Sequence, residues 1–360
     1  MKVLQVINDL DTGGAEKLLL ETIPIYNQKG IEVDLLLLNG KSTAFLEILK
    51  NINCCKIYSL GTSVYNPIHV FRIMPFLWKY DIAQVHLFPS QYWIVIAKIF
   101  SFSKIKLIVT EHSTTNPRIN NFFLRIIDRF IYRFYDKIVC ITDDVFKIIY
   151  KHLKLPKSKF VLIQNGVKLQ NIYDAEPYAK NAISSLFIEE DILLIHIASF
   201  NKHKDQKTAI TALKYLPEKI KILFVGEGIL KKNCEDLAQE LNVAERTVFL
   251  GNRTDVPQLL KTSNISILST NGEGFCLTAI ESMAAEIPFI GSDVPGMINV
   301  KGAGILFKKG SAEELAFFIK KLIDEKDFYQ SIVNLGKIRA RQFDINIMVE
   351  KHIDLYKTLV

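Results

Sequence analysis

The stretch Ile265-Ser266-Ile267-Leu268-Ser269-Thr270-Asn271-Gly272-Glu273-Gly274-Phe275-Cys276-Leu277-Thr278-Ala279-Ile280-Glu281-Ser282-Met283-Ala284-Ala285 has the pattern of one strand, one loop and one helix. Its apolar beginning, 265–268, is typical of a short buried strand. The sequence from Ala279 onward favours a helix that ends near Pro288. A strand, a loop and a helix in this order form the building unit of α/β folds.

The same unit recurs along the chain. Continuous apolar runs, typical of strands that are covered on both faces, alternate with helical patterns in two series. The first series has its apolar runs at 3–7, 33–38, 82–85, 105–109 and 137–141, and the second has them at 193–198, 221–225, 247–250, 265–268 and 288–291. The alternation predicts an α/β fold with two doubly wound, Rossmann-like parallel sheets.

A polar, irregular stretch separates the two series. The first series ends with the turn signal Asn165-Gly166, and irregular sequence follows from 168 to about 180. We therefore expect a first domain at 1–167, a second at 168–342 and an amphipathic terminal helix at 343–360. Ligands of such sheets bind at the carboxyl ends of the strands, so we expect the site in a central cleft that both domains face.

Composition narrows the class of protein. The 360 residues are 49% hydrophobic and 23% charged, as in globular proteins. The five cysteines form no Cys-x-x-Cys pair, which favours a reduced, cytoplasmic protein. The first residues do not resemble a signal peptide, and no long uncharged apolar run predicts a membrane-spanning helix.

Basic charge is concentrated in one region. The formal net charge is +7, and eight basic against three acidic residues between 98 and 137 supply five of these charges. Nucleic-acid-binding motifs do not accompany this charge, so we expect no nucleic-acid partner.

Within the basic region, the segment 122–133 is amphipathic, and Arg125, Asp128, Arg129 and Arg133 share one helical face. One interpretation is a helix that packs its apolar face on the core and leaves the charged stripe in solvent. The other is a surface for the headgroups of an anionic membrane. Three further cations of the region would contribute to that surface: Lys98, Lys104 and Lys106.

Two glutamates bracket the loop and the helix start of the opening stretch. Glu273 lies on the loop, and Glu281 lies in the first turns of the helix. A helix start offers free N–H groups and a positive dipole end to a phosphate, and ionised carboxylates accept hydrogen bonds from sugar hydroxyls. This arrangement suits a phosphate with a sugar on each side, as in a nucleotide-sugar. The alternative is an ordinary helix N-terminus with acidic residues.

Other candidate residues follow predicted strands. Gly13 and Gly14 open a helix after the first strand, where glycines let a ligand approach the backbone. His112 follows the strand at 105–109 and can hold a sugar hydroxyl or transfer a proton. Lys204 can reach a diphosphate, although its loop, which also contains Lys202, can equally be a solvated basic loop.

Two more strand exits, at Gly226 and Arg253, could line a pocket for a base. The chain contains one Asp-x-Asp triplet, Asp9-Leu10-Asp11, and no Cys-x-x-Cys pair. We expect neither a metal ion nor a bound cofactor.

Taken together, these motifs resemble the glycosyl transferases group 1 family of retaining enzymes with the two-domain GT-B fold. The likeness covers nearly the whole chain, and its most specific element is Glu273 and Glu281 with seven residues between them. The supporting elements are Gly13-Gly14-Ala15-Glu16, Glu111-His112-Ser113, Asn165-Gly166-Val167, Val225-Gly226-Glu227-Gly228 and the closing helix after Phe343. The resemblance implies an acceptor-binding first domain, a second domain that binds a nucleotide-sugar, and a terminal helix that crosses back to the first domain.

The resemblance also implies roles for individual residues. In the catalytic set, Glu273 would contact the donor sugar, His112 would be the cleft histidine and Lys204 would bind the diphosphate. The remaining donor-binding residues would be Glu281 at the ribose, Gly274, Phe275, Cys276 and Leu277 at the phosphates and sugar, and Ser199, Lys202, Gly226, Arg253, Asn165, Gly13 and Gly14. The family commonly has an arginine where this chain has Ser199, so Lys202 or Arg253 would complete the cationic pair.

These implications predict a metal-independent, retaining hexosyltransferase. It would move a sugar from a nucleotide-sugar, with UDP as the expected nucleotide, to a lipid-linked or polysaccharide acceptor of bacterial surface glycans such as capsule or lipopolysaccharide. We expect it in the cytoplasm or peripherally at the inner face of the plasma membrane. Two alternatives stay open, namely a non-catalytic nucleotide-sugar-binding partner protein, suggested by Ser199, and a nucleotide-sugar epimerase of similar fold.

Overall fold

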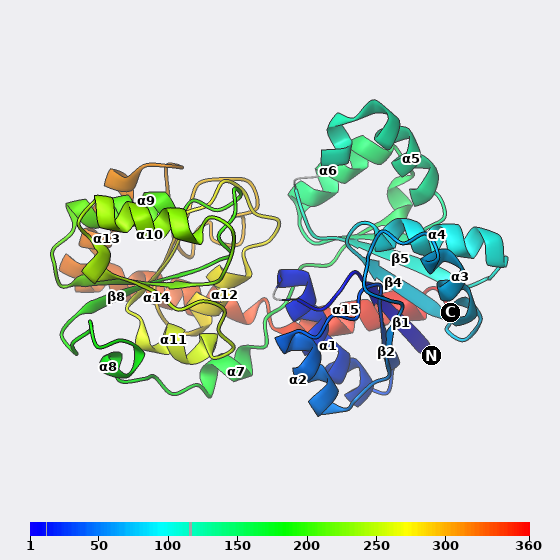
Figure 1. Cartoon of the computed structure of the whole chain (residues 1–360), viewed down its shortest axis with the longest axis horizontal. Coiled ribbons are helices and arrows are strands. Elements are labelled where there is room, and N and C mark those ends of the chain that lie inside the picture. Colours follow the sequence, from blue (N-terminus) through cyan, green and yellow to red (C-terminus); the bar gives the residue numbers. More distant parts are fainter. Residues whose placement is uncertain (12, 115–116) are drawn as a thin grey trace. The chain divides into compact units, whose positions relative to one another are not determined.

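Two units make up the fold in the computed structural model (Figure 1). Unit 1 comprises Met1–Gly166 and Ile345–Val360, and unit 2 comprises Val167–Asp344. The structure describes residues 1–11, 13–114 and 117–360. Each unit is built around a parallel sheet with helices packed on it, which confirms the predicted pair of Rossmann-like sheets.

In the described part of unit 1, seven parallel strands form a sheet in the order β3-β2-β1-β4-β5-β6-β7. The strands are β1 (Lys2–Ile7), β2 (Glu32–Leu37), β3 (Ile57–Ser59), β4 (Ile82–His86), β5 (Lys106–Glu111), β6 (Lys137–Cys140) and β7 (Phe160–Leu162). The helices are α1 (Gly14–Gln28), α2 (Ala44–Ile52), α3 (His69–Ile73), α4 (Ser90–Ser101), α5 (Phe122–Tyr132), α6 (Asp143–Leu153) and α15 (Ile345–Lys357). Every residue of β4 is buried, because helices cover both faces of a parallel sheet.

The helix α15 belongs to unit 1, although the chain reaches it only after unit 2 (Figure 1, red). It packs on α1, where the Tyr26 hydroxyl and His352 Nδ1 are hydrogen-bonded at 2.9 Å. One turn further on, the Tyr356 hydroxyl accepts a hydrogen bond of 3.3 Å from Gln5 of β1. Buried polar contacts therefore fix the position of α15 on unit 1.

In the described residues of unit 2, six parallel strands form a sheet in the order β10-β9-β8-β11-β12-β13. The strands are β8 (Ile192–Ile197), β9 (Ile220–Val225), β10 (Thr247–Phe249), β11 (Ile265–Leu268), β12 (Phe289–Ser292) and β13 (Ile305–Phe307). The helices are α7 (Leu169–Tyr173), α8 (Lys180–Ile183), α9 (Gln206–Ala212), α10 (Lys231–Glu240), α11 (Val256–Thr262), α12 (Leu277–Ala284), α13 (Ala312–Asp324) and α14 (Lys326–Arg341).

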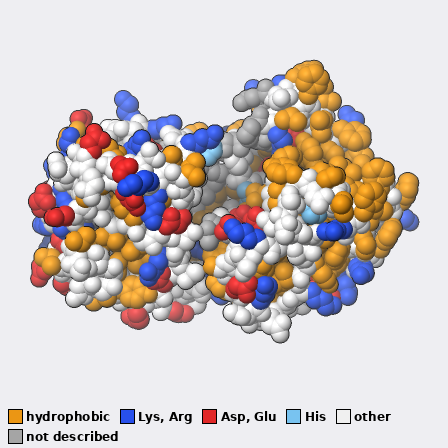
Figure 2. Space-filling model, in the orientation of Figure 1, with side chains coloured by type: hydrophobic (Ala, Val, Ile, Leu, Met, Phe, Trp, Pro, Cys, Tyr) orange, Lys and Arg blue, Asp and Glu red, His pale blue; other side chains and the backbone are white. Residues whose placement is uncertain are grey.

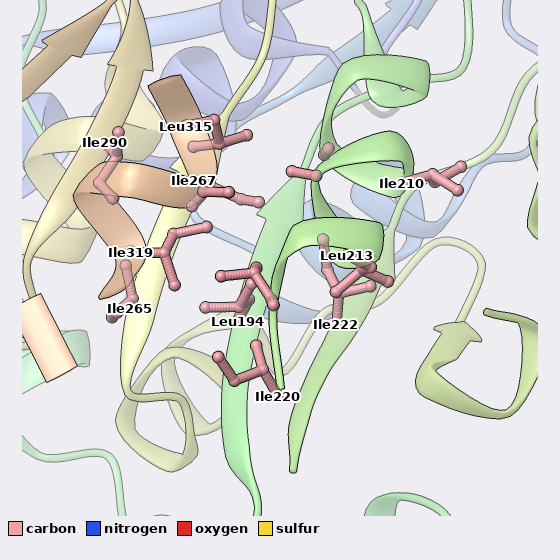
Figure 3. Close-up of a cluster of buried hydrophobic side chains, with 14 of the residues drawn as sticks. Leu194, Ile210, Leu213, Ile220, Ile222, Ile265, Ile267, Ile290, Leu315 and Ile319 are labelled. Atoms are coloured by element: carbon pink, nitrogen blue, oxygen red, sulfur yellow. The ribbon is translucent and has the colours of Figure 1, made fainter. Parts of the chain in front are cut away.

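The core of unit 2 joins this sheet to its helices. Leu194 and Ile267 from the strands lie in one buried cluster with Ile210 of α9 and Ile319 of α13 (Figure 3). Burying one such side chain contributes about 1.5–3 kcal/mol, so the cluster stabilises the strand ends from which the loops leave.

Two strands, β3 and β13, lack a sequence signal. Each has only three residues, and β3 is half-buried to exposed. Both lie at a sheet edge. Three residues are too few to show a periodicity, so the pairing with a neighbouring strand defines them rather than their own pattern.

Each sheet has a switch point, where the strand order reverses direction. In unit 1 the switch point lies between β1 and β4, and in unit 2 it lies between β8 and β11. The loops at the carboxyl ends of these strand pairs diverge, and ligands of open α/β sheets bind there. These two places are therefore where candidate functional residues are expected.

The helix α5 differs from the expectation of an apolar face packed on the core. Its Asp128 is 0% exposed, whereas Phe123 is 74% and Ile126 is 51% exposed. Asp128 faces inward because Arg118 Nε, at 3.5 Å, and His152 Nε2, at 2.7 Å, contact its Oδ2. The prediction of a solvated charged stripe is therefore wrong for Asp128. Arg118, which the basic region includes, is itself buried and contributes little to a charged surface.

Candidate functional site

The switch point of unit 2 brings two predicted loops together. The loop after β8 and the loop after β11 run side by side, because Lys204 and Thr270 form an antiparallel bridge. The Asn271 N–H donates to the His203 carbonyl at 2.9 Å, and the Asp205 N–H donates to the carbonyl of the residue before Thr270 at 3.1 Å. Main-chain bonds thus hold the two loops in register.

Lys204 and Glu273 form a salt bridge across these loops. Their side chains are 19% and 12% exposed, so the pair is largely shielded from solvent. Lys202 is exposed, and the Ser199 hydroxyl accepts a hydrogen bond of 2.8 Å from Asn201. Of the basic residues in the loop, Lys204 is therefore the one that the structure places against the predicted carboxylate.

A turn that the sequence reasoning missed positions Glu273. The Glu273 N–H donates to the Pro295 carbonyl at 3.1 Å. The next residue, Gly296, has φ of +89°, and a Cβ there would overlap the Glu273 carbonyl oxygen. Only glycine combines this conformation with such a close approach. The dipeptide Pro295-Gly296 is a turn signal, but only the fold shows which carboxylate it supports.

The helix α12 begins directly after this loop, with Cys276 as its N-cap and no side-chain capping bond. The first turn of such a helix carries N–H groups that have no partner within the helix, and a positive dipole end. Phe275 and Cys276 are buried, and the Asn299 amide donates to the Cys276 carbonyl at 2.9 Å. These contacts fix the position of the helix start, whose dipole end favours an anion.

Burial raises the pKa of the Cys276 thiol well above its usual range, and the nearby Glu273 carboxylate raises it further. Lys204 lowers this pKa and Glu281 raises it, so all three charged groups lie within electrostatic reach of one thiol. The thiol is neutral at physiological pH and has no role as a nucleophile. Glu281 itself lies inside α12 and is only 5% exposed.

The predicted residues Gly226 and Arg253 have different surroundings. Gly226 has φ of +137°, and a Cβ there would overlap the Ala198 carbonyl, so this glycine lets two strand-end loops pack together. Arg253 is exposed, and its Nε donates to Asp255 Oδ1 at 2.7 Å. Its role as a second cation for a diphosphate stays a prediction.

The switch point of unit 1 holds two histidines. His112, just after β5, has its Nε2 2.9 Å from Nδ1 of His86, the last residue of β4. His86 Nε2 lies 2.9 Å from Gln5 Oε1. His86 comes next to His112 because β4 pairs with β5, and this pairing is visible only in the fold.

A chain of hydrogen bonds determines which nitrogen of His112 carries the proton. Gln5 Nε2 donates to the Tyr356 hydroxyl, which donates to Gln84 Oε1. Gln5 Oε1 must therefore accept, so His86 Nε2 carries a hydrogen. Burial lowers the pKa of His86 well below its usual range, which leaves its Nδ1 unprotonated as an acceptor. Consequently His112 donates from Nε2.

The ring of His112 is then neutral, with the lone pair on Nδ1. Burial lowers the pKa of His112 to about 4, so it holds no charge at neutral pH. Nδ1 can accept a hydrogen bond from a hydroxyl, or a proton, but it cannot donate one. Sequence reasoning missed Gln5, Gln84 and Tyr356, because their roles depend on contacts between distant segments.

The predicted glycines lie on the other side of this switch point. Gly13 caps α1 and Gly14 is its first residue. In the same turn, burial raises the pKa of Glu16 to about 7, and the neighbouring Asp9 and Asp11 raise it further. The predicted Asn165 is buried at the end of unit 1.

Two negative findings apply to the part of the chain that the structure describes. No group of three or more His, Cys, Asp or Glu residues there could hold a metal ion. Within the same residues, no helix has both the length and the apolar character that crossing a membrane requires.

The two Rossmann-like parallel sheets define the class of fold as GT-B. The family model of the glycosyl transferases group 1 matches residues 179–339, and that of Glycosyltransferase Family 4 matches residues 12–171. The predicted family is thereby confirmed.

Individual relatives agree with this assignment. The putative glycosyltransferase EpsD of Bacillus subtilis is 27% identical over 239 residues, which are 64% of this chain and 62% of EpsD, so less than two thirds of EpsD is matched. A Campylobacter jejuni enzyme is 25% identical over 94% of both chains. It is the N-acetylgalactosamine-N,N'-diacetylbacillosaminyl-diphospho-undecaprenol 4-alpha-N-acetylgalactosaminyltransferase. The crystal structure of Anabaena HepE with UDP and glucose has the same fold, with a TM-score of 0.86, 18% identity and 99% of both chains covered.

Proposed function

We propose that the protein is a retaining, metal-independent glycosyltransferase that uses a UDP-sugar as its donor. The observation that carries this proposal is the salt bridge between Lys204 and Glu273 at the switch point of unit 2, directly before the start of α12. A cation and the positive end of a helix dipole suit a diphosphate, and carboxylates suit the hydroxyls of a sugar and a ribose. No other described switch point combines both kinds of group.

In the proposed reaction, the bond between the anomeric carbon and the diphosphate breaks, and its electron pair stays on the diphosphate. The acceptor hydroxyl oxygen bonds to the same face of that carbon, and its proton passes to an oxygen of the leaving phosphate. Lys204 and the first amides of α12 would stabilise the growing negative charge. Glu273 would contact the donor sugar, and Glu281 would bind the ribose.

The similar proteins suggest the substrates. The Campylobacter jejuni relative is named for a diphospho-undecaprenol acceptor, and HepE was crystallised with UDP and glucose. We therefore propose that unit 2 binds the UDP-sugar and that unit 1 binds a lipid-linked or polysaccharide acceptor of bacterial surface glycans. An enzyme with such an acceptor would work in the cytoplasm, peripherally at the inner face of the plasma membrane.

The neutral His112 fits a substrate hydroxyl in this proposal. Because its Nδ1 accepts and its Nε2 is used by His86, it would orient a sugar hydroxyl rather than neutralise a phosphate. A hydroxyl without any such partner in a desolvated site would cost about 1–3 kcal/mol.

The test is to incubate the purified full chain with UDP- and GDP-sugars and a polyprenyl-diphosphate-linked sugar. We expect transfer from a UDP-sugar, with and without a chelator, and retention of the anomeric configuration in the product by NMR. Glu281→Gln should weaken UDP binding at least roughly tenfold, because an ionised acceptor is lost. The matched control is Glu286→Gln, since Glu286 forms a salt bridge of 2.8 Å with Lys337 outside the candidate site.

The alternatives give different results in the same assay. UDP-sugar binding without turnover would favour a non-catalytic binding protein, to which Ser199 points. Conversion of the donor sugar in the absence of any acceptor would indicate an epimerase. The proposal is wrong if neither UDP nor a UDP-sugar binds. It is also wrong if Glu281→Gln binds UDP as tightly as the wild type and the Glu286→Gln control do.

A further inference from the structure

An apolar face of α5 lies on the surface of unit 1. Five large side chains recur there at every fourth position, and we call them the α5 face: Phe122, Phe123, Ile126, Ile127 and Phe130. They are between 43% and 74% exposed. Figure 2 shows hydrophobic side chains gathered over this part of unit 1. A contiguous apolar face of this kind marks an interaction surface.

Polar contacts beneath the helix keep this face outside. On the inner side, Asp128 contacts Arg118 and His152, and the Tyr132 hydroxyl donates to Glu111. Turning the α5 face inward would break these contacts and leave a buried charge unpaired. The exposure of the apolar residues is therefore built into the packing of α5.

A basic groove adjoins the α5 face. It lies between α5 and α6 and has a volume of about 510 Å³. No carboxylate occurs among its described lining residues. Four cations line it: Arg125, Arg129, Lys151 and Lys154. The groove can therefore attract an anion.

A buried N–H of Arg125, a residue that lines the groove, strengthens this conclusion. Arg125 Nε has no hydrogen-bond partner among the described residues. Buried polar groups are normally hydrogen-bonded, so an oxygen-rich ligand such as a phosphate would satisfy the Arg125 N–H.

We propose that the α5 face and the basic groove together dock unit 1 on an anionic lipid bilayer. The apolar side chains lie among the lipids, and the groove holds a lipid phosphate. A second copy of the chain is a poorer occupant, because it would bring the same cations to the contact. This inference rests on the proposed location at the membrane and assigns that location a surface.

The experiment is sedimentation of the full chain with two kinds of vesicle, one of phosphatidylcholine alone and one of phosphatidylcholine mixed with the anionic lipid phosphatidylglycerol. The wild type should bind the anionic vesicles at least about tenfold more tightly. Phe123→Ser with Ile127→Ser should weaken binding to both kinds of vesicle. Lys151→Gln with Lys154→Gln should reduce binding to the anionic vesicles roughly tenfold and leave binding to the neutral ones unchanged.

The matched control is Phe317→Ser with Ile338→Ser, because these two residues of unit 2 are 58% and 63% exposed. It should bind vesicles as the wild type does. The proposal would be overturned if this control lost as much vesicle binding as Phe123→Ser with Ile127→Ser, or if the wild type bound neutral and anionic vesicles equally. A solution dimer that dissociates in Phe123→Ser with Ile127→Ser would also overturn it. UDP binding, measured on the same variants, should be unchanged, so failure of the membrane inference can be told from failure of the proposed function.

Discussion

The two switch points of this protein use opposite kinds of chemistry. At the switch point of unit 2, Lys204 and Glu273 form a salt bridge next to the start of a helix. At the switch point of unit 1, His86 and His112 are neutral, since burial lowers the pKa of both rings. The first place is suited to the charge of a diphosphate, and the second to the hydroxyls of a neutral sugar. The same sheet topology therefore offers two different sites, depending on the loops that it carries.

The way each site is held also differs. In unit 2, main-chain bonds and Gly296 position the loops. In unit 1, hydrogen-bonded side chains from distant segments position His112. One of them is Tyr356 of the terminal helix, whose hydroxyl donates to Gln84. Changes at the two sites should consequently differ in size and in what they alter.

The largest effect is expected from Lys204→Met. Removing the cation that faces a leaving diphosphate should lower kcat by about 10²–10³-fold, as the loss of one preorganised electrostatic contact does in other enzymes. The measurement is steady-state transfer from the UDP-sugar. The control is Lys232→Met, since Lys232 pairs with Asp236 on the exposed surface of α10 and should change kcat less than about twofold. Similar losses of kcat in both variants would contradict the proposed role of Lys204 at the diphosphate.

An intermediate effect is expected from Tyr356→Phe. Without the hydroxyl, Gln5 loses its acceptor, so nothing holds His86 and His112 in single tautomers, and kcat should fall by a factor on the order of ten. The tautomer of His112 can be read directly by ¹⁵N NMR, which should show the proton on Nε2 in the wild type and a mixture in the variant.

The control for that variant is Tyr329→Phe. The Tyr329 hydroxyl donates to the Asn264 carbonyl in unit 2 at 2.9 Å, so its loss should cost similar stability, about 1 kcal/mol, without changing the His112 tautomer or kcat. A proton on Nδ1 of His112 in the wild type would contradict the neutral, accepting site.

The smallest effect concerns Glu16 and appears as a pH dependence of stability. Because its folded pKa is raised to about 7 from the ordinary 4.5, the folded state binds the proton more tightly than the unfolded state. The stabilisation is full below pH 4.5 and is lost as the pH rises through 7. Glu16→Gln should therefore unfold as the wild type does at pH 4.5 but about 2–4 °C higher at pH 8, which thermal scans would measure. Equal melting temperatures of the wild type and Glu16→Gln at pH 8 would show that ionisation of Glu16 does not destabilise the folded state.

The sequence predicted the unit 2 site better than the unit 1 site. Lys204 and Glu273 each follow a predicted strand, and β8 and β11 turned out to be neighbours. Their two loops could therefore be found by pattern, although not their salt bridge. His112 was found in the same way. The residues that orient it through His86, Gln5 and Tyr356, are 351 residues apart in the chain, and no local pattern connects them.

The helix α5 shows a second limit. A helical pattern with apolar and charged sides predicts an amphipathic helix, but it does not say which side faces the core. Here Arg118 and His152 supply partners for Asp128, so this carboxylate lies inside, whereas Arg133 of the same charged side is exposed. Burying a paired carboxylate became possible only because the fold brings those partners to it.

The amino-acid sequence alone determined that the chain alternates strands and helices in two series, and where acidic and basic side chains follow the strands. These features are local, since they depend on apolar periodicity and on turn residues within a few positions. Only the tertiary structure decided that Lys204 meets Glu273, that Tyr356 orients His112 through Gln5 and His86, and that α5 turns its apolar side outward. Each of these depends on contacts between segments far apart in the chain, where desolvation and partner geometry, not local preference, set the free energy.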